Sequence, residues 1–161
     1  MRQFVLFIAL LPVFSVPAAA QKKVNDEAAI RAAIENESRY FWARDLKNWR
    51  KQWVHENYVI WRAASRDGVT QYQSWDAWNK HVESFFAESP EAIPYAGHVE
   101  KRNYVFRIYG SGAWVSFEQV NNGVITYETR VMEKVKGDWR IAMVELIFNA
   151  NEKITQDSGG N

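Results

Sequence analysis

The spacing of apolar positions predicts a helix near the start of the chain. Between residues 26 and 43, apolar side chains recur every three or four positions, the period of a helix with one buried face. Asn25 or Asp26 has a side chain suited to cap the start of this helix. The expected inner face of the helix consists of Ile30, Ala33, Ile34, Glu37 and Phe41.

Two shorter helices and a hairpin are predicted before residue 98. Each helix follows a residue whose side chain can cap it, and the hairpin surrounds an Asp-Gly pair that favours a tight turn. The expected segments are a short helix after Asp45 carrying Leu46, Trp49 and Trp53, a hairpin of residues 57–63 and 69–73, and a helix after Ser74 that ends near Glu88.

After residue 98 the apolar period changes to strict alternation, which is typical of strands. Four strands are expected at about residues 99–109, 112–120, 124–135 and 138–148, and each intervening turn contains glycine. Strands joined by such short turns form an antiparallel meander. The order of elements predicts an α+β fold in which three N-terminal helices pack on one face of a curved, mainly antiparallel sheet.

Both faces of the predicted meander carry apolar side chains, so each face needs a cover. We expect a mixed face, which holds most ionisable groups, to enclose a cavity beneath the helices. The other face is uniformly apolar and convex, and we expect it to pack on a second copy in a homodimer; a monomer with partly exposed aromatic side chains is the alternative. The mixed face is assigned Trp114, Ser116, Glu118, Glu128, Arg130, Met132, Ala142, Val144 and Leu146. The apolar face is assigned Val115, Phe117, Tyr127, Val131, Ile141, Met143 and Ile147.

Residues 1–20 have the features of a secretory signal peptide. Arg2 precedes the apolar run FVLFIALLPVFSV, and small residues at 18–20 offer a cleavage site before Gln21. The run is short for a membrane span, which needs about 20 apolar residues; a retained membrane anchor is the alternative. Cleavage would place residues 21–150 as one domain, with a flexible tail of residues 151–161, in the periplasm or outside the cell and without a stable membrane span.

Composition argues against several classes of partner and chemistry. Removing Arg2 with the signal peptide changes the formal net charge from +1 to about 0, which favours neither nucleic acid nor an anionic membrane as partner. The chain has no cysteine, which excludes thiolate chemistry and Cys-ligated zinc, and His55 with Glu56 lacks a suitably spaced third metal ligand. We therefore expect no metal and no cofactor. The eight tryptophans favour a large packed surface or an aromatic-lined cavity.

Three segments carry a resemblance to a known superfamily: ARDLKNWRKQW, GSGAWVSFE and ETRVMEKVKGDWRIAMVEL. With the order of elements, they make residues 26–148 resemble the nuclear transport factor 2-like superfamily, which includes SnoaL-like, ketosteroid isomerase-like and DUF4440-type domains. The resemblance implies a cystatin-like cone with a pocket between the helices and the concave sheet, and assembly into dimers or larger rings. ETRVMEKVKGDW is also similar to the association domain of calmodulin-dependent kinases, whose pocket carries arginines.

The resemblance does not carry over the catalytic residues of the isomerases. Those enzymes use a carboxylate base, a tyrosine and a second acid. Trp61 falls at the position of the base and Glu37 at the position of the tyrosine, so neither position has the required group. The second acid falls near Glu128 or Arg130. The sequence therefore does not support steroid isomerisation.

The ionisable groups of the mixed face are the candidate functional residues. An isolated charge in a low-dielectric interior is very costly, so Arg130 is expected to pair with Glu118 or Glu128. Such a pair could simply close the cone, or Arg130 could keep donors that clamp a carboxylate or carbonyl ligand. The candidate catalytic residues, as general base, are Glu128 and Glu118. The candidate ligand-binding residues are Arg130, Tyr40, Trp61, Trp114 and Ser116.

Three functions are compatible with these observations. The first is binding of a small, partly apolar molecule, with a carboxylate or carbonyl, in the cavity of the cone. The second is a cofactor-independent isomerase, cyclase or dehydratase of the SnoaL-like type that uses a cavity Glu as general base. The third is a structural or interaction module with a vestigial pocket, in which Trp61 and Trp114 would fill the cavity. A fold alone does not decide between them.

Overall fold

The computed structural model describes residues 18–95 and 97–148, which form an α+β fold. The helices are α1 (Ala18–Trp42), α2 (Leu46–Arg50) and α3 (Trp75–Glu88). The strands are β1 (Ile60–Ser65), β2 (Gly68–Gln73), β3 (Val99–Tyr109), β4 (Gly112–Asn121), β5 (Val124–Val135) and β6 (Asp138–Phe148). Every predicted helix and strand is present, and the strand ends agree with the predicted ones within a few residues.

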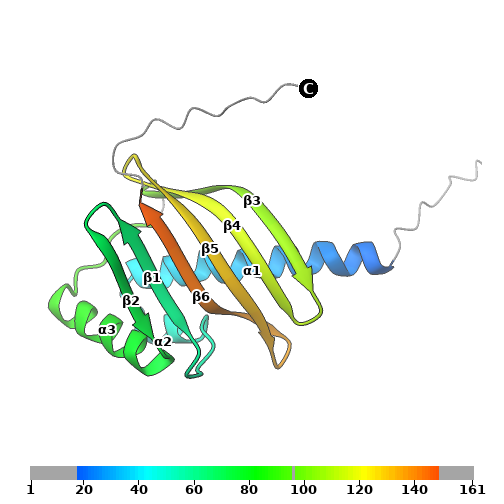
Figure 1. Cartoon of the computed structure of the whole chain (residues 1–161), viewed down its shortest axis with the longest axis horizontal. Helices are drawn as coiled ribbons and strands as arrows, with labels where there is room; N and C mark the ends of the chain where they lie inside the picture. Colours follow the sequence, from blue (N-terminus) through cyan, green and yellow to red (C-terminus); the bar gives the residue numbers. More distant parts are fainter. Residues whose placement is uncertain (1–17, 96, 149–161) are drawn as a thin grey trace, which may run out of the picture.

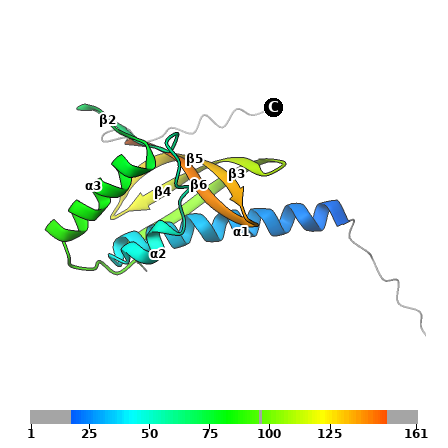
Figure 2. The same ribbon diagram turned by 90° about the horizontal axis from the view of Figure 1, so that it is seen from below.

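The six strands form one curved sheet in the order β2-β1-β6-β5-β4-β3. β1 pairs with β6 in parallel, and the other neighbouring strands are antiparallel. The predicted meander is therefore β3 to β6, and the hairpin β1–β2 extends the sheet past β6 (Figure 1). Figure 2 shows the three helices on the same side of the sheet. We call this side of the sheet the inner face and the opposite side the outer face.

Helix α1 begins earlier than predicted. Because it starts at Ala18, Asn25 and Asp26 lie within the helix, and neither caps its start. The carboxylate of Asp26 is buried and accepts hydrogen bonds from Lys134 Nζ (2.6 Å) and Trp139 Nε1 (3.0 Å), which belong to β5 and β6. These contacts clamp the first half of α1 to the sheet.

The two ends of the chain lie largely outside the described residues. Of the predicted signal peptide, residues 18–20 belong to the first turn of α1, while residues 1–17 are not described. The predicted tail of residues 151–161 also lies outside the described part. Within residues 18–95 and 97–148, no helix has the length and apolar character needed to cross a membrane.

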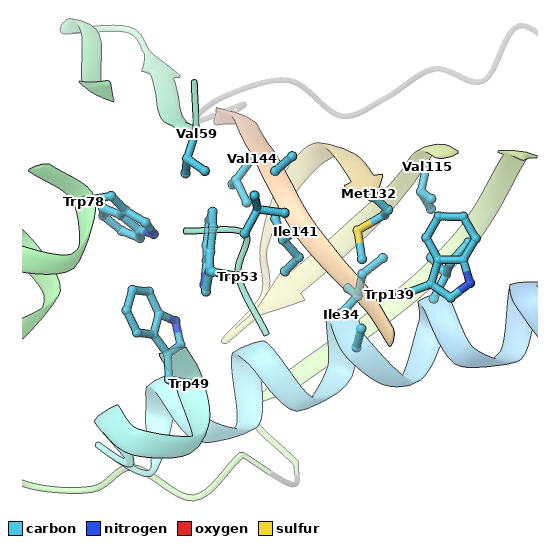
Figure 3. Close-up of a cluster of buried hydrophobic side chains, with 14 of the residues drawn as sticks. Ile34, Trp49, Trp53, Val59, Trp78, Val115, Met132, Trp139, Ile141 and Val144 are labelled. Carbon is cyan, nitrogen blue, oxygen red and sulfur yellow. The ribbon is translucent and has the colours of Figure 1, made fainter. Parts of the chain in front are cut away.

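The hydrophobic core fills the space between the helices and the inner face of the sheet (Figure 3). Trp49, Trp53 and Trp78 are at most 4% exposed and pack together at one end of it. The ring centroids of Trp49 and Trp53 are 5.7 Å apart, and those of Trp53 and Trp78 are 5.8 Å apart. Ile34 of α1 and Met132 of β5 are fully buried nearer the other end. Much of the tryptophan content therefore serves packing between the helices and the sheet.

The inner face contains residues of β4 that the sequence pattern assigned to the outer face. Val115 pairs with Arg130, and Phe117 pairs with Glu128. Directly paired side chains lie on the same face of a sheet. All four residues are at most 3% exposed, so the charged pair of β5 lies beneath the helices among apolar neighbours. The prediction that Val115 and Phe117 face outward is wrong.

Trp114, Ser116 and Glu118 consequently lie on the outer face, and the prediction that they face the cavity is wrong. The cause is one residue in the turn between β4 and β5. Asn121 pairs with Val124, which leaves a two-residue turn, whereas the sequence pattern indicated a three-residue turn. Because side chains alternate with a period of two, a shift of one residue exchanges the faces of the whole strand.

A β-bulge in β6 also changes the prediction for Ile141. The register of β6 against β5 shifts by one residue between Ile141 and Met143. As a result, Ile141 and Val144 both face inward and are 0% and 1% exposed. The bulge therefore moves Ile141 into the core and leaves Met143 on the outer face.

Candidate functional site

A cavity of about 480 Å³ lies between α1, α3 and the inner face of the sheet. Its volume is typical of sites that bind small molecules. Its polar lining comes from α1, β4 and β5 and includes Glu37, Ser38, Gln119, Thr126, Glu128 and Arg130. Its apolar lining comes mainly from α1, β1, α3 and β6 and includes Phe41, Trp42, Trp61, Trp78, Val144 and Leu146. Charged and aromatic side chains thus share one half-open pocket.

The charged groups of β5 form a buried ion pair in the wall of this cavity. Arg130 Nη2 contacts Glu128 Oε2, and the two residues are 3% and 2% exposed. Thr126 Oγ1 donates a hydrogen bond to Glu128 Oε1 (3.0 Å). The Arg130 guanidinium also lies over the ring of Phe117, 5.3 Å from its centroid. Of the two partners expected for Arg130, the structure selects Glu128.

Several buried polar atoms that belong to the lining residues have no hydrogen-bond partner among the described residues. They include Arg130 Nε, Trp78 Nε1 and Gln119 Oε1. Glu128 Oε2 touches Arg130 in the ion pair but is not aligned in a hydrogen bond. Buried polar atoms normally have hydrogen-bond partners, so these two N–H donors and the oxygen acceptor have unused hydrogen-bonding capacity.

Glu37 places a second carboxyl group in the cavity wall. It is 8% exposed on α1 and accepts hydrogen bonds from Trp49 Nε1 (2.9 Å) and Ser38 Oγ (3.3 Å). Burial raises the pKa of Glu37, while the positive charge of Arg130 and the hydrogen bond from Trp49 act in the opposite direction. Glu37 was not among the site residues predicted from the sequence. The available signal was an acidic residue at helical spacing with Ile34 on a face expected to be buried.

An aromatic pair forms part of the apolar lining. Trp61 of β1 stacks on Trp78 of α3, with ring centroids 4.7 Å apart and an interplanar angle of 13°. Trp61 is therefore in the cavity wall, as expected from the sequence, and Trp78 joins it. Trp61 and Trp114 do not fill the cavity together, because Trp114 is on the outer face and 38% exposed.

Other predicted site residues lie away from the cavity. Tyr40 packs against the core beside Arg39, whose guanidinium is 5.1 Å from its ring centroid, and it is not part of the cavity lining. On the outer face, Arg102 Nε donates a hydrogen bond to Glu118 Oε2 (2.9 Å). Hydrogen bonds from Asn103 and Arg102 hold the pKa of Glu118 below its ordinary value. Of the predicted residues, the structure brings Glu128, Arg130 and Trp61 together and leaves Glu118, Tyr40, Trp114 and Ser116 outside.

A second buried cation lies behind the cavity wall. The side chain of Lys101 on β3 is fully buried, and its Nζ is 3.5 Å from Glu35 Oε2. Lys101 also donates a hydrogen bond to the hydroxyl of Tyr95 (2.7 Å), and Tyr104 donates one to Glu35 Oε1 (2.9 Å). Burial lowers the pKa of Lys101. Lys101 thus has its own carboxylate partner, separate from the ion pair between Arg130 and Glu128 on β5.

The described residues contain no group of three or more His, Asp or Glu side chains placed to hold a metal ion. The polar chemistry of the cavity comes from two carboxyl groups, one guanidinium, the indoles of three tryptophans, and the hydroxyl and amide groups beside them. These groups can donate and accept hydrogen bonds and can exchange protons.

No family model matches the chain, and no curated protein matches it. Solved structures do share its fold. An NTF2-like protein of unknown function from Pseudomonas putida KT2440 has a TM-score of 0.60 at 13% identity, over 81% of this chain and 91% of that chain. A cystatin-like fold protein from Burkholderia xenovorans LB400 has a TM-score of 0.59 at 15% identity, over 78% and 92%. An NTF-2 like protein of unknown function from Silicibacter pomeroyi DSS-3 has a TM-score of 0.59 at 16% identity, over 79% and 98%.

These likenesses show that the chain has the NTF2-like, cystatin-like fold, which the sequence resemblance implied. At such low identities they show the fold alone. A function has to be argued from the cavity itself.

Proposed function

We propose that this protein of NTF2-like fold binds a small, partly apolar molecule in its cavity and holds it through a carbonyl or carboxylate oxygen. The observation that carries the proposal is that two residues of the cavity wall, Arg130 and Trp78, each have a buried N–H donor, Nε and Nε1, without a hydrogen-bond partner among the described residues. Both belong to residues that are at least nine-tenths buried. A ligand oxygen that accepts from them would satisfy donors that otherwise lose their hydration without compensation.

The apolar lining of the cavity supports the proposal that the ligand is partly apolar. Trp61 and Trp78 offer flat, polarisable surface, and Val144 and Leu146 offer aliphatic surface in the same cavity. Pockets of this kind bind a ligand chiefly by burying its apolar area, and a few polar groups fix its orientation. A ring or short chain that carries one oxygen acceptor matches both parts of the lining.

The Trp78→Phe variant tests the indole donor while keeping an aromatic ring. We expect roughly three- to tenfold weaker retention of the ligand, because one hydrogen bond to it is lost. Trp53→Phe is the matched control: Trp53 is equally buried, its Nε1 also lacks a partner among the described residues, and it does not line the cavity. Retention by Trp53→Phe should be unchanged, provided that both variants remain folded.

The measurement is native mass spectrometry of the protein purified without denaturation. A mass above that of the polypeptide, released on unfolding and identified as one class of small molecule, is the expected result. Protein that carries no such molecule and takes up none from an extract of its own cells would contradict the proposal. Equal retention by Trp78→Phe and Trp53→Phe would remove Trp78 from the site.

A second candidate function is proton transfer on the bound molecule, as in a SnoaL-like isomerase, cyclase or dehydratase with a cavity Glu as general base. The observation that favours it is Glu37, a carboxyl group in the cavity wall whose pKa is raised by burial. Glu128 is the other carboxyl group available, whereas Glu118 lies on the outer face. Exchange of solvent deuterium into the retained molecule, lost in Glu37→Gln, would support catalysis; a molecule that exchanges no carbon-bound hydrogen would argue for binding alone.

We also propose that the outer face of the sheet forms a homodimer. This face carries Val105, Trp114 and Ile147, which are 56%, 38% and 49% exposed, together with polar side chains such as Ser116 and Glu118. This also corrects the prediction of a uniformly apolar outer face, but exposed apolar side chains of this size still favour a covered surface. A second copy could cover it through a self-complementary contact.

Introducing a charge on this face should dissociate the dimer. We expect Ile147→Glu to convert a particle of twice the chain mass into one of single chain mass at micromolar concentration, because a carboxylate would be buried at the interface. Val24→Glu is the control, since Val24 is 60% exposed on α1 and lies on the other side of the sheet. Light scattering after size-exclusion chromatography measures the particle mass of both variants. A wild-type protein of single chain mass would contradict this assembly.

A further inference from the structure

The carboxyl groups in and near the cavity wall differ in whether they form an ion pair. Glu128 is paired with Arg130, and Glu35 is paired with Lys101. The partners of Glu37 are instead uncharged: the indole of Trp49 and the hydroxyl of Ser38. Among the described residues, Glu37 is thus a buried carboxyl group without an ion pair of its own.

The charged and titratable groups that face Glu37 come from three parts of the fold. They are Arg130 and Glu128 on β5, Lys101 on β3, and Tyr95 in the loop before β3. Each of the two cations already has a carboxylate in contact, so its field at Glu37 is partly cancelled. Burying an ionised carboxylate without a compensating charge is costly, and such a group binds a proton instead.

The hydrogen bonds of Glu37 are compatible with an uncharged acid. Oε1 accepts the short bond from Trp49 Nε1 (2.9 Å), which suits a carbonyl oxygen. Oε2 has only the longer contact from Ser38 Oγ (3.3 Å), so a proton on Oε2 would be free to point elsewhere. Because Glu37 lines the cavity, that direction can be toward a ligand.

We propose that Glu37 is an uncharged carboxylic acid that donates a hydrogen bond to an uncharged carbonyl oxygen of the ligand, so that the cavity selects ketones, aldehydes or amides over carboxylates. This inference rests on the proposed binding function and narrows its ligand class. A carboxylate ligand would have to share Arg130 with Glu128 and would add a negative charge to a buried space. A carbonyl oxygen has two lone pairs, so it can accept from Glu37 and from one further donor without changing the net charge.

The protonation state of Glu37 can be measured without a ligand. At about pH 7, where an ordinary Glu is ionised, infrared spectra of the protein should show the C=O stretching band of a protonated carboxyl group. The band should disappear in Glu37→Gln and persist in Glu27→Gln. Glu27 is the control, since it also lies on α1, pairs only with Lys23 and does not line the cavity. A wild-type spectrum without the band, or a band that survives in Glu37→Gln, would overturn the inference.

The selectivity is tested with two probes on the same ring, acetylnaphthalene and naphthoate, by quenching of the fluorescence of Trp61 and Trp78. We expect the ketone to bind at least roughly tenfold more tightly than the carboxylate. Its affinity should fall roughly three- to tenfold in Glu37→Gln and stay unchanged in Glu27→Gln. Stronger binding of naphthoate, an unchanged affinity in Glu37→Gln, or no binding of the ketone would overturn the inference. Recovery of a carboxylate by native mass spectrometry would overturn it too, while leaving the proposed binding function in place.

Discussion

Replacing Arg130 by Met lowers the free energy of unfolding by about 3–5 kcal/mol, the cost typical of breaking a buried ion pair by removing one partner. The reason is the burial of Glu128: once Arg130 is absent, its carboxylate keeps the hydrogen bond from Thr126 but has no cation in contact. Urea unfolding followed by tryptophan fluorescence measures the change.

The control is the double variant Glu128→Gln/Arg130→Met, which removes both charges and keeps similar side-chain volume. We expect it to be at least about 2 kcal/mol more stable than Arg130→Met. Replacing both members of a buried ion pair is far less costly than leaving one buried charge without its partner. If Arg130→Met unfolds at the same denaturant concentration as the wild type, the pair is not buried in the folded protein. That result would remove the electrostatic basis of the site.

Replacing Asp26 by Ala lowers the free energy of unfolding by about 2–4 kcal/mol, because it leaves the buried indole N–H of Trp139 and the partly exposed ammonium of Lys134 without their shared acceptor. Glu27→Ala is the matched control on the next position of α1. Glu27 makes only an exposed ion pair with Lys23 at 3.9 Å, so its loss should change stability by less than about 0.5 kcal/mol. Comparable losses in the two variants would contradict the clamp between α1 and the sheet.

The contribution of Asp26 should depend on pH in a defined direction. Hydrogen bonds from Lys134 and Trp139 lower the pKa of Asp26 in the folded protein. A carboxyl group with a lowered pKa stabilises the folded state fully above its unfolded pKa, about 4, and this contribution disappears as the pH falls through the lower folded value. The difference in stability between wild type and Asp26→Ala should therefore be constant above about pH 5 and shrink below about pH 4. A difference that grows on acidification would contradict the assignment.

The elements of the fold could be predicted because their signals are local. Asp45 and Ser74 cap α2 and α3, as expected from their side chains: they accept hydrogen bonds from the backbone N–H groups of Asn48 (3.0 Å) and Ala77 (3.2 Å). Alternation of apolar residues located all four strands of the meander. Capping and periodicity act within a few residues, so a single sequence contains them.

The faces of the sheet were harder to predict, because they depend on register. The error at Glu118 arose from one residue in the turn before β5, and the error at Ile141 arose from a bulge. The turn decides which face the next strand presents, and the bulge interrupts the alternation within β6, so that Ile141 and Val144 both face inward. The pairing of Arg130 with Glu128 was partly predictable, because a buried charge requires a partner and the two side chains lie on the same side of one strand.

The remaining site residues were not predictable, because their roles come from contacts between distant segments. Glu37 becomes a buried acid only when Trp49 of α2 and the cation of β5 are brought against α1. Trp78 becomes a donor in the cavity wall only because α3 packs beside β1, where Trp61 stacks on it. A helix face or a capping pattern places such residues in the core but does not show which of them borders a cavity.

The central claim is that the buried polar groups of the inner face bind a ligand in the cavity. A crystal structure of the protein, saturated with the molecule that native mass spectrometry recovers, tests this claim most directly. We expect continuous density in the cavity, with an oxygen atom within hydrogen-bonding distance of Arg130 Nε or Trp78 Nε1. Density on the outer face against Trp114 and Ser116, with only water between Glu37 and Arg130, would contradict it.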